Sequence, residues 1–446
     1  MQATPRLERA GREEFARRRQ QLMRSMGRDA IAVVPAATVK HRNSDVEFPY
    51  RQDSNFHYLT GFGEPDSVAV LVPGREQAQY ILFVRDRDAL RETWDGRRAG
   101  PDGARTVYGA DDAFPITDID EILPGLMENR AKVFYAMGGH PEFDHRMLSW
   151  LQHLRSQSAR SGRQAPLEMV ALDHVLHDMR LYKSRAELGL MRTSGAIAAA
   201  AHVRAMRHTR PGGHEYGIVA ELLHEFRRNN ADCSYQPIVG GGANSCILHY
   251  RENDQPLADG DLLLVDAGCE VAGYASDITR TWPVNGRFTP AQRAIYEVVL
   301  QAQQAAIAQV KPGNHWNAPH EAATEVITRG LIELGLLKGK LSALLKSGAC
   351  KRFFMHRTGH WLGLDVHDVG DYKVGDEWRV LEPGMVMTVE PGIYIPAGSK
   401  GIPKRWWNIG VRIEDDIVVT RTGHENLTSA VPSDIAAVEA LVGTGL

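Results

Sequence analysis

Residues 257–268 read Leu-Ala-Asp-Gly-Asp-Leu-Leu-Leu-Val-Asp-Ala-Gly, and residues 381–392 read Leu-Glu-Pro-Gly-Met-Val-Met-Thr-Val-Glu-Pro-Gly. Aligned at a constant offset of 124 residues, each copy is a turn, an apolar run and then a carboxylate, Asp266 in the first and Glu390 in the second. Apolar runs of this length between turn residues predict buried strands. Because a buried carboxylate must be paired, hydrogen-bonded or metal-bound, the two acids predict half of a two-metal site in a duplicated fold.

A second repeat supports the duplication. Arg210-Pro-Gly-Gly-His214 and Lys311-Pro-Gly-Asn-His315 are 101 residues apart, and each separates two predicted helices. The helices before these breaks are predicted over residues 184–208, after the capping-box residues Ser184 and Glu187, and from Thr289 to about Val310. Such breaks are common between helices, but together with the repeated acid-bearing strand they indicate an internal duplication.

The first part of the chain has a different pattern. Strands are predicted at 30–34, 67–72, 79–84 and 131–135, with helices between them that include 14–26 and 142–154. The polar stretch 156–166 contains small residues, Gly and Pro, and predicts a loop near a domain boundary. We therefore expect an α/β (α+β) protein with an N-terminal α/β domain over residues 1–175 and a duplicated catalytic domain over residues 176–446.

The bulk composition excludes several classes of protein. The 446 residues are 43% hydrophobic and 24% charged, as in a soluble globular protein, and the net charge of −3 does not indicate a nucleic acid or an anionic membrane as partner. No apolar run is long enough for a membrane span, and the N-terminus has no apolar segment typical of a secretory signal. The four cysteines form no CxxC pair, which favours a reducing compartment, and we expect a cytoplasmic protein.

Each half also offers a second carboxylate on a second predicted strand, Asp277 in the first half and Glu414 in the second. Between the halves lies a Gly-containing segment, 356–368, with three histidines, of which we expect His360 to join the four acids. Four carboxylates and one imidazole suit two divalent ions, manganese above all, with cobalt, iron or zinc as alternatives. Such a pair of ions activates water and polarises a carbonyl, so the natural reaction class is hydrolysis of an amide or a related bond.

The ordered set Asp266, Asp277, His360, Glu390 and Glu414 resembles the metal ligands of the pita-bread metallopeptidases, which include methionine aminopeptidases, prolidases and aminopeptidases P. The segments 266–281, 359–368, 389–394 and 410–416 resemble the bacterial aminopeptidase P group most. The resemblance extends into the N-terminal part through residues 45–62 and covers nearly the whole chain. It implies a pita-bread fold for the catalytic domain.

The resemblance also implies roles for individual residues. Glu390 would be both a ligand and the general base, and His249 and His367 would stabilise the tetrahedral oxyanion. His356, Tyr394 and Arg412 resemble residues around the pocket for the proline ring, although Arg412 alone is also compatible with a structural ion pair. Two further residues, Tyr235 and Asp45, match positions near the substrate amine and the metal site. Trp94 resembles a tryptophan that reaches a neighbouring subunit's active site, so the family implies a homo-oligomer, a dimer or a tetramer.

The implied activity is hydrolysis of the N-terminal Xaa-Pro bond of peptides through a metal-bridging hydroxide. The main alternative is a prolidase, which shares the fold and the ligands but is limited to Xaa-Pro dipeptides. A methionine aminopeptidase does not need the 175-residue N-terminal domain. A non-catalytic binding protein or a creatinase-like hydrolase would lack part of the ligand set, and all five ligands are present.

Overall fold

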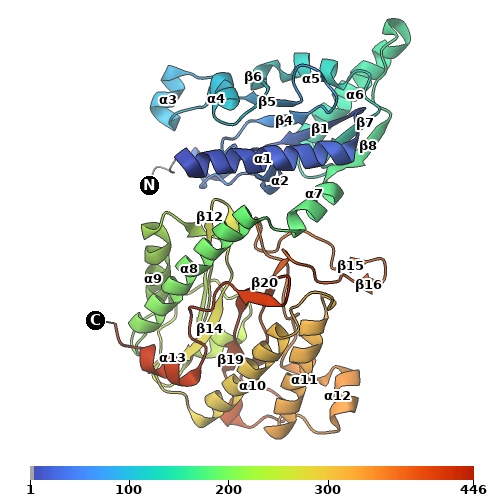
Figure 1. The fold of residues 1–446 in the computed structure, drawn as a ribbon. Coiled ribbons are helices and arrows are strands. Elements are labelled where there is room, and N and C mark those ends of the chain that lie inside the picture. Colours follow the sequence, from blue (N-terminus) through green and yellow to red (C-terminus); the bar gives the residue numbers. More distant parts are fainter. Residues whose placement is uncertain (1–4, 446) are drawn as a thin grey trace. The chain divides into compact units, whose positions relative to one another are not determined.

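The computed structural model describes residues 5–445, and the chain divides into two compact units between Met179 and Arg180. The first unit is built on a six-stranded sheet with the strand order β6-β5-β4-β1-β7-β8 (Figure 1). Its central strands β1 (Ala30–Pro35), β4 (Val68–Leu71) and β5 (Tyr80–Val84) are buried along their whole length, as the apolar runs predict. The sheet is mixed, because β1 pairs with β4 in the antiparallel sense and with β7 (Lys132–Tyr135) in the parallel sense.

The remaining elements of this unit complete the α/β arrangement. Residues of α5 (Ile119–Met127) and α6 (Pro141–Ser161) share one apolar core with the sheet. The other elements are α1 (Pro5–Met26), β2 (His41–Asn43), β3 (Val46–Glu47), α2 (Ser54–Thr60), α3 (Ala89–Asp95), α4 (Gly100–Thr106), β6 (Asp112–Pro115), β8 (Glu168–Ala171) and α7 (Leu172–Leu181).

One local prediction is wrong in this unit. Residues 156–161 were expected to start a loop, but they form the last turns of α6, which ends at Gly162 in a left-handed conformation with φ of 69°. The Gly162 amide donates to the Ser158 carbonyl, so this glycine, and not the polar stretch before it, ends the helix. Polar small residues are tolerated on the solvent face of a helix that is already held by its apolar face.

The second unit contains the predicted helices and both capping boxes. Ser184 caps α8 (Arg185–His208) and Thr289 caps α10 (Pro290–Ile307), each with the reciprocal side-chain bond from the third helical residue. After the Pro-Gly breaks come α9 (Glu215–Arg228) and α11 (Ala318–Glu333), so the helix pair is repeated as predicted. Helix α8 packs against α9, and α10 packs against α11 (Figure 1). Two short helices, α12 (Leu341–Ser347) and α13 (Ile435–Leu441), follow later in the chain.

The strands of the second unit repeat in the same order. In the first half, β11 (Leu262–Asp266) pairs with β14 (Thr279–Pro283), and the hairpin of β12 (Cys269–Val271) and β13 (Tyr274–Ala275) lies between them in sequence. In the second half, β17 (Val386–Val389) pairs with β20 (Asp415–Val419), and β18 (Gly392–Ile395) and β19 (Ile409–Arg412) form the intervening pair. The remaining strands are β9 (Asp232–Cys233), β10 (Ile238–Gly241), β15 (Lys373–Val374), β16 (Glu377–Trp378) and β21 (His424–Asn426).

This connectivity confirms the duplication expected from the sequence and gives the mixed α/β architecture. Each half brings two strand ends together at one place, which is where the predicted acids lie. None of the helices in the described part of the chain combines the length and the apolar character that a membrane span needs.

Candidate metal centre

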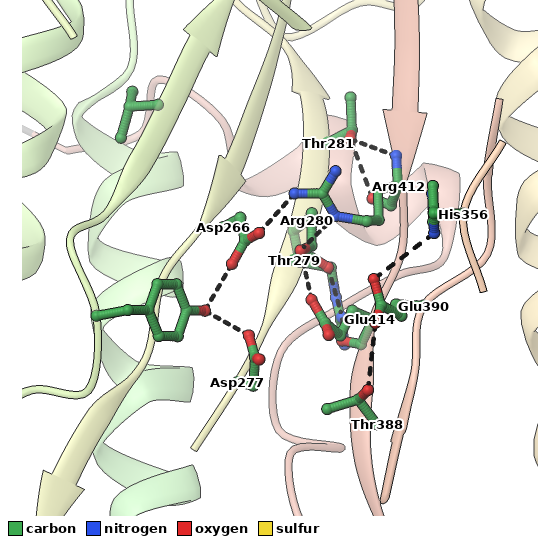
Figure 2. A network of polar contacts seen from close by, with 12 residues as sticks. Asp266, Asp277, Thr279, Arg280, Thr281, His356, Thr388, Glu390, Arg412 and Glu414 are labelled. Carbon is green, nitrogen blue, oxygen red and sulfur yellow. Dashed lines mark hydrogen bonds and ion pairs between the residues drawn. The ribbon is translucent and has the colours of Figure 1, made fainter. Parts of the chain in front are cut away.

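The five predicted ligands line one cavity of about 480 Å³ in the second unit. Asp277, His360 and Glu414 each offer one ligand atom, and these three atoms lie within 4.8 Å of one another. Asp266 and Glu390 complete the set at the same cavity. Figure 2 shows the four carboxylates gathered from both halves of the unit.

The repeated strands bring these acids together. Asp266 is the last residue of β11, where it pairs in register with Thr279 at the start of β14, two residues after Asp277. In the second half, Glu390 directly follows β17 and Glu414 directly precedes β20. The Glu414 amide donates to the Thr279 carbonyl at 3.0 Å, which joins the two halves at the acids.

At two positions near predicted ligands, another segment of backbone comes so close that only glycine fits. A Cβ atom on Gly268 would lie 1.8 Å from the Ser276 carbonyl oxygen, and one on Gly359 would lie 2.0 Å from the Thr388 carbonyl oxygen. Gly268 follows Asp266 by two residues, and Gly359 precedes His360. Any larger residue at either position would therefore displace the backbone that carries a ligand.

The acids of the first half have cationic and hydroxyl partners. The Arg412 guanidinium donates to Asp266 Oδ2 at 2.5 Å, and the Tyr235 hydroxyl oxygen lies 2.5 Å from Asp266 Oδ1 and also within hydrogen-bond distance of Asp277, so its single proton is shared between the two carboxylates. Burial raises the pKa of Asp266 even though Arg412 opposes this shift. Burial, together with the charges of Asp266 and Asp277, raises the pKa of Tyr235 well above its usual range, so the hydroxyl stays a donor.

The acids of the second half have weaker partners. Thr279 donates its hydroxyl to Glu414 at 2.6 Å, and Thr388 donates to Glu390 at 3.4 Å (Figure 2). Burial raises the pKa of Glu390 to about 7, and burial with three neighbouring carboxylates raises the pKa of Glu414 well above its ordinary value. Hydroxyl donors alone do not balance these charges.

His360 is oriented so that one nitrogen faces the acids. Its Nδ1 donates to the Trp361 carbonyl at 2.9 Å, which leaves Nε2 at 3.4 Å from Asp277 and 3.7 Å from Glu390. Burial disfavours a charge on this ring, but the hydrogen bond to Asp277 and the charge of Glu390 outweigh it and raise the pKa of His360 to about 9.

This arrangement fits divalent cations. Four carboxylates line one cavity and repel one another, and burial followed by these neighbouring charges raises the pKa of Glu414, while burial raises that of Glu390 although His360 and Arg412 oppose it. Oxygen-rich sets with one imidazole suit hard or borderline divalent ions. Asp266, Asp277, His360, Glu390 and Glu414 are the residues that would hold them.

A directional chain of hydrogen bonds runs beside the acids. Arg412 donates to the Tyr394 hydroxyl at 2.9 Å, Tyr394 contacts His356 Nε2 at 2.9 Å, and His356 Nδ1 donates to the Arg357 carbonyl at 2.7 Å. Burial and the charge of Arg412 lower the pKa of His356 to about 4, so the ring is neutral and Nε2 accepts from Tyr394. His356 and Arg412 line the cavity, whereas Tyr394 lies behind them and is 1% exposed.

The other predicted site residues fall in two groups. His249 and His367 are solvent-exposed and line the cavity, and the ring centroid of His367 lies 4.2 Å from that of His360. Partial desolvation of the ring at the cavity and the charge of the neighbouring His360 lower the pKa of His367. Asp45, between β2 and β3, and Trp94, on α3 with 86% exposure, belong to the first unit and are not among the residues of this cavity.

The sequence did not identify several polar residues of the site. Thr279 and Thr388 donate to ligands, and the buried Asp416 accepts the backbone N–H of Asp277 at 3.1 Å. Thr388 lies two residues before Glu390, and Thr279 lies two residues after Asp277. Residues two apart in a strand share a face, so a polar residue at this spacing from a predicted ligand could have indicated both threonines. The aromatic wall of the cavity, formed by Trp316, Tyr372 and Trp378, has no such local signal.

Two family models match the chain. Metallopeptidase family M24 matches residues 189–421, and the aminopeptidase P N-terminal domain matches residues 15–135. Among curated proteins, the chain is 46% identical to the Xaa-Pro aminopeptidase of Escherichia coli (strain K12), over 97% of this chain and 98% of that protein. It is 37% identical to the mitochondrial intermediate cleaving peptidase 55 of Arabidopsis thaliana, over 96% and 83% of the two chains.

Solved structures agree with these matches. The structure of Pseudomonas aeruginosa aminopeptidase PepP has a TM-score of 0.95 and 58% identity, and the match covers 96% of this chain and 97% of that one. Zn-substituted E. coli aminopeptidase P in complex with product has a TM-score of 0.94 and 46% identity, over 96% and 98%. The chain therefore belongs to metallopeptidase family M24 and, within it, to the Xaa-Pro aminopeptidases that carry the aminopeptidase P N-terminal domain.

Proposed function

We infer that this protein is a metal-dependent aminopeptidase that hydrolyses the bond between an N-terminal residue and a following proline. The observation that carries this inference is the convergence of Asp266, Asp277, His360, Glu390 and Glu414 on one cavity whose charges need divalent cations. The E. coli relative is named an Xaa-Pro aminopeptidase and aligns over nearly its whole length. This favours aminopeptidase activity over the prolidase alternative and over a non-catalytic binding protein.

When bound, two divalent cations would polarise the scissile carbonyl and lower the pKa of water, which is the chemistry that hydrolysis of an amide needs. The residues of the chain supply the rest. Glu390, whose pKa burial raises to about 7, accepts the proton of the attacking water. His249 and His367, at the open side of the cavity, donate to the substrate carbonyl as negative charge develops on its oxygen.

Specificity for proline follows from the neutral His356 face. An Xaa-Pro amide has no N–H, so a site that relies on a backbone donor from the substrate loses that contact. We propose that the proline ring packs against His356, which the Tyr394 and Arg412 chain holds in one orientation. Tyr235 and Asp45 are proposed to lie near the amine of the first residue.

The proposal also covers the metal ion, the roles of the two domains, the assembly and the location. Manganese is the proposed ion, with cobalt, iron or zinc as alternatives, because the ligands are mostly carboxylates. The N-terminal domain, residues 1–175, is proposed to mediate assembly and to restrict access to the catalytic domain, residues 176–446. A homotetramer in which Trp94 reaches a neighbouring subunit is supported by the 86% exposure of this large apolar side chain. A cytoplasmic location, with no nucleic acid or membrane as partner, is proposed from the net charge of −3 and from the absence of a CxxC pair among the four cysteines.

The test is hydrolysis of Ala-Pro-Ala and of Ala-Pro by metal-stripped protein, with and without added Mn²⁺. Manganese-dependent release of alanine from the tripeptide supports the proposal. Cleavage of the dipeptide alone would replace it with a prolidase, and cleavage of neither would favour a binding protein.

A further inference from the structure

The cavity has a second region that neither the metal ligands nor the His356 chain uses. Its lining there consists of Trp316, Arg357, Tyr372 and Trp378. The Trp316 ring centroid lies 4.3 Å from that of Tyr372 and 5.6 Å from that of Trp378, so the three rings form a continuous wall. The wall is held in place by the β15–β16 hairpin, because the Trp316 amide donates to the Arg379 carbonyl at 2.8 Å and the Arg379 amide donates to the Tyr372 carbonyl at 3.0 Å.

Arg357 lies over this wall. Its guanidinium carbon is 5.3 Å from the Trp316 centroid and 5.0 Å from the Trp378 centroid, within cation–π distance of both rings. One of its nitrogens donates to the Asn317 side-chain oxygen at 2.7 Å. These contacts hold the guanidinium at the cavity and leave its other donors for a ligand.

The two arginines of the cavity lining differ in what they bind. Arg412 is saturated by Asp266, Tyr394 and Thr279. Arg357, in contrast, has no carboxylate of the described residues within ion-pair distance. Asn317 lies between it and Glu321, because Asn317 accepts from Arg357 and its amide donates to Glu321 at 2.7 Å. Since a guanidinium binds a carboxylate through two parallel hydrogen bonds, Arg357 is positioned to bind the carboxylate of a ligand.

The position of Arg357 in the sequence gives the end of the peptide that it meets. It directly follows His356, whose Nδ1 donates to the Arg357 carbonyl at 2.7 Å, while Tyr235, which we propose lies near the amine of the first residue, contacts Asp266 and Asp277. If proline packs on His356, the next residue of the peptide comes to Arg357. This step rests on the proposed function.

We propose that Arg357, over Trp316 and Trp378, forms a subsite for the residue after proline and pairs with the free carboxylate of Xaa-Pro-Xaa tripeptides. The rings provide an apolar floor for the third side chain, and the guanidinium sets a preference for short substrates with a free C-terminus. A C-terminal amide can accept a hydrogen bond from the same guanidinium, but it is neutral and forms no ion pair.

The test compares KM for Ala-Pro-Ala and Ala-Pro-Ala-amide in the manganese-loaded protein. Wild type is expected to have a KM about tenfold lower for the acid than for the amide, and R357A is expected to lose this ratio because its KM for the acid rises more than its KM for the amide. R357K keeps the charge without the paired donors and should retain only part of the preference. K373A is the matched control, because Lys373 also lies over Trp378, at 4.7 Å, but does not line the cavity.

The outcomes distinguish a failure of the proposed function from a failure of the Arg357 subsite. If wild type cleaves neither peptide, the proposed function fails. If wild type cleaves both with equal KM, or if R357A keeps the wild-type ratio, the subsite is wrong and the proposed function stands. If K373A and not R357A abolishes the ratio, the carboxylate binds elsewhere and the assignment to Arg357 is overturned.

Discussion

The two halves of the second unit hold their acids in different ways. In the first half, Asp266 is paired with the buried Arg412, and the Tyr235 hydroxyl shares its proton between Asp266 and Asp277. In the second half, Glu390 and Glu414 have hydroxyl donors from Thr388 and Thr279. The pKa of Asp277 is lowered despite its burial, with His360 as the main opposing cause, and that of Glu414 is raised well above its ordinary value, while burial raises the pKa of Asp266 in the first half as well.

Duplicated strands therefore need not place equivalent partners around their carboxylates. Asp266 has a guanidinium in direct contact, whereas the side chain of Glu414 accepts from the hydroxyl of Thr279.

The Asp277→Ala substitution should reduce kcat/KM for Ala-Pro-Ala by roughly 10³-fold or more, because it removes a ligand and with it the electrostatic stabilisation of the transition state. The measurement is steady-state hydrolysis at saturating Mn²⁺, with circular dichroism to verify the fold. Asp259→Ala, at an exposed turn, is the matched control and should keep wild-type activity. Full activity of Asp277→Ala would remove this residue from the site.

The Arg412→Met substitution should lower the free energy of unfolding of the metal-free protein by about 3 kcal/mol, because it leaves Asp266 buried without its ion-pair partner. Thr279→Val, which removes a hydroxyl donor to Glu414 in the other half, should cost only about 1 kcal/mol. Urea unfolding of both variants measures the difference. Equal losses would show that the two halves are neutralised alike.

The metal-free protein should become less stable as pH rises. Burial raises the pKa of folded Glu390 from its ordinary 4.5 to about 7, so between these values the folded state binds more protons than the unfolded state. The resulting stabilisation is complete below pH 4.5 and is lost as pH rises through 7, by on the order of 2–3 kcal/mol. His360, with its pKa raised from 6.5 to about 9, continues the decline.

Urea unfolding of metal-stripped protein between pH 4.5 and 7 measures this slope, and Glu390→Gln should flatten it. Added Mn²⁺ should reverse it, because cation binding requires the ionised carboxylates. A stability that rises with pH in the absence of metal would contradict the raised pKa of Glu390.

Tyr394→Phe should have the smallest effect, about a fivefold loss in kcat/KM for Ala-Pro-Ala, expressed mainly in KM. The hydroxyl joins Arg412 to His356, and its loss frees the ring that we propose contacts proline. The metal content should stay that of wild type. A fall in metal content would show that Tyr394 acts on the ligands and not on the proline pocket.

The sequence predicted much of this architecture because the signals were local. The capping boxes at Ser184 and Thr289 begin their helices as predicted, and the repeated run ending at Asp266 and Glu390 forms paired strands in each half. The five predicted ligands line one cavity, as the duplication implies. The error at 156–161 has a local cause, because the residue that ends α6 is Gly162.

Other features depend on contacts that no local pattern reports. Residues far apart in sequence meet in the pairing of Arg412 with Asp266 and in the acceptance of the Asp277 amide by Asp416. Similarly, the wall of Trp316 and Trp378 exists only once the β15–β16 hairpin contacts the start of α11. The sequence names the candidate ligands, whereas the fold determines how their charges are balanced.

The number of metal ions bound per chain tests whether both halves of the fold contribute to one metal centre. Protein equilibrated with Mn²⁺ and freed of excess ion should contain two ions per chain by elemental analysis, one for each pair of negative charges among the four carboxylates. Asp277→Ala should contain fewer than two. Wild-type protein that holds no ion, or whose content is unchanged by loss of Asp277, would contradict a metal centre assembled from both halves of the fold.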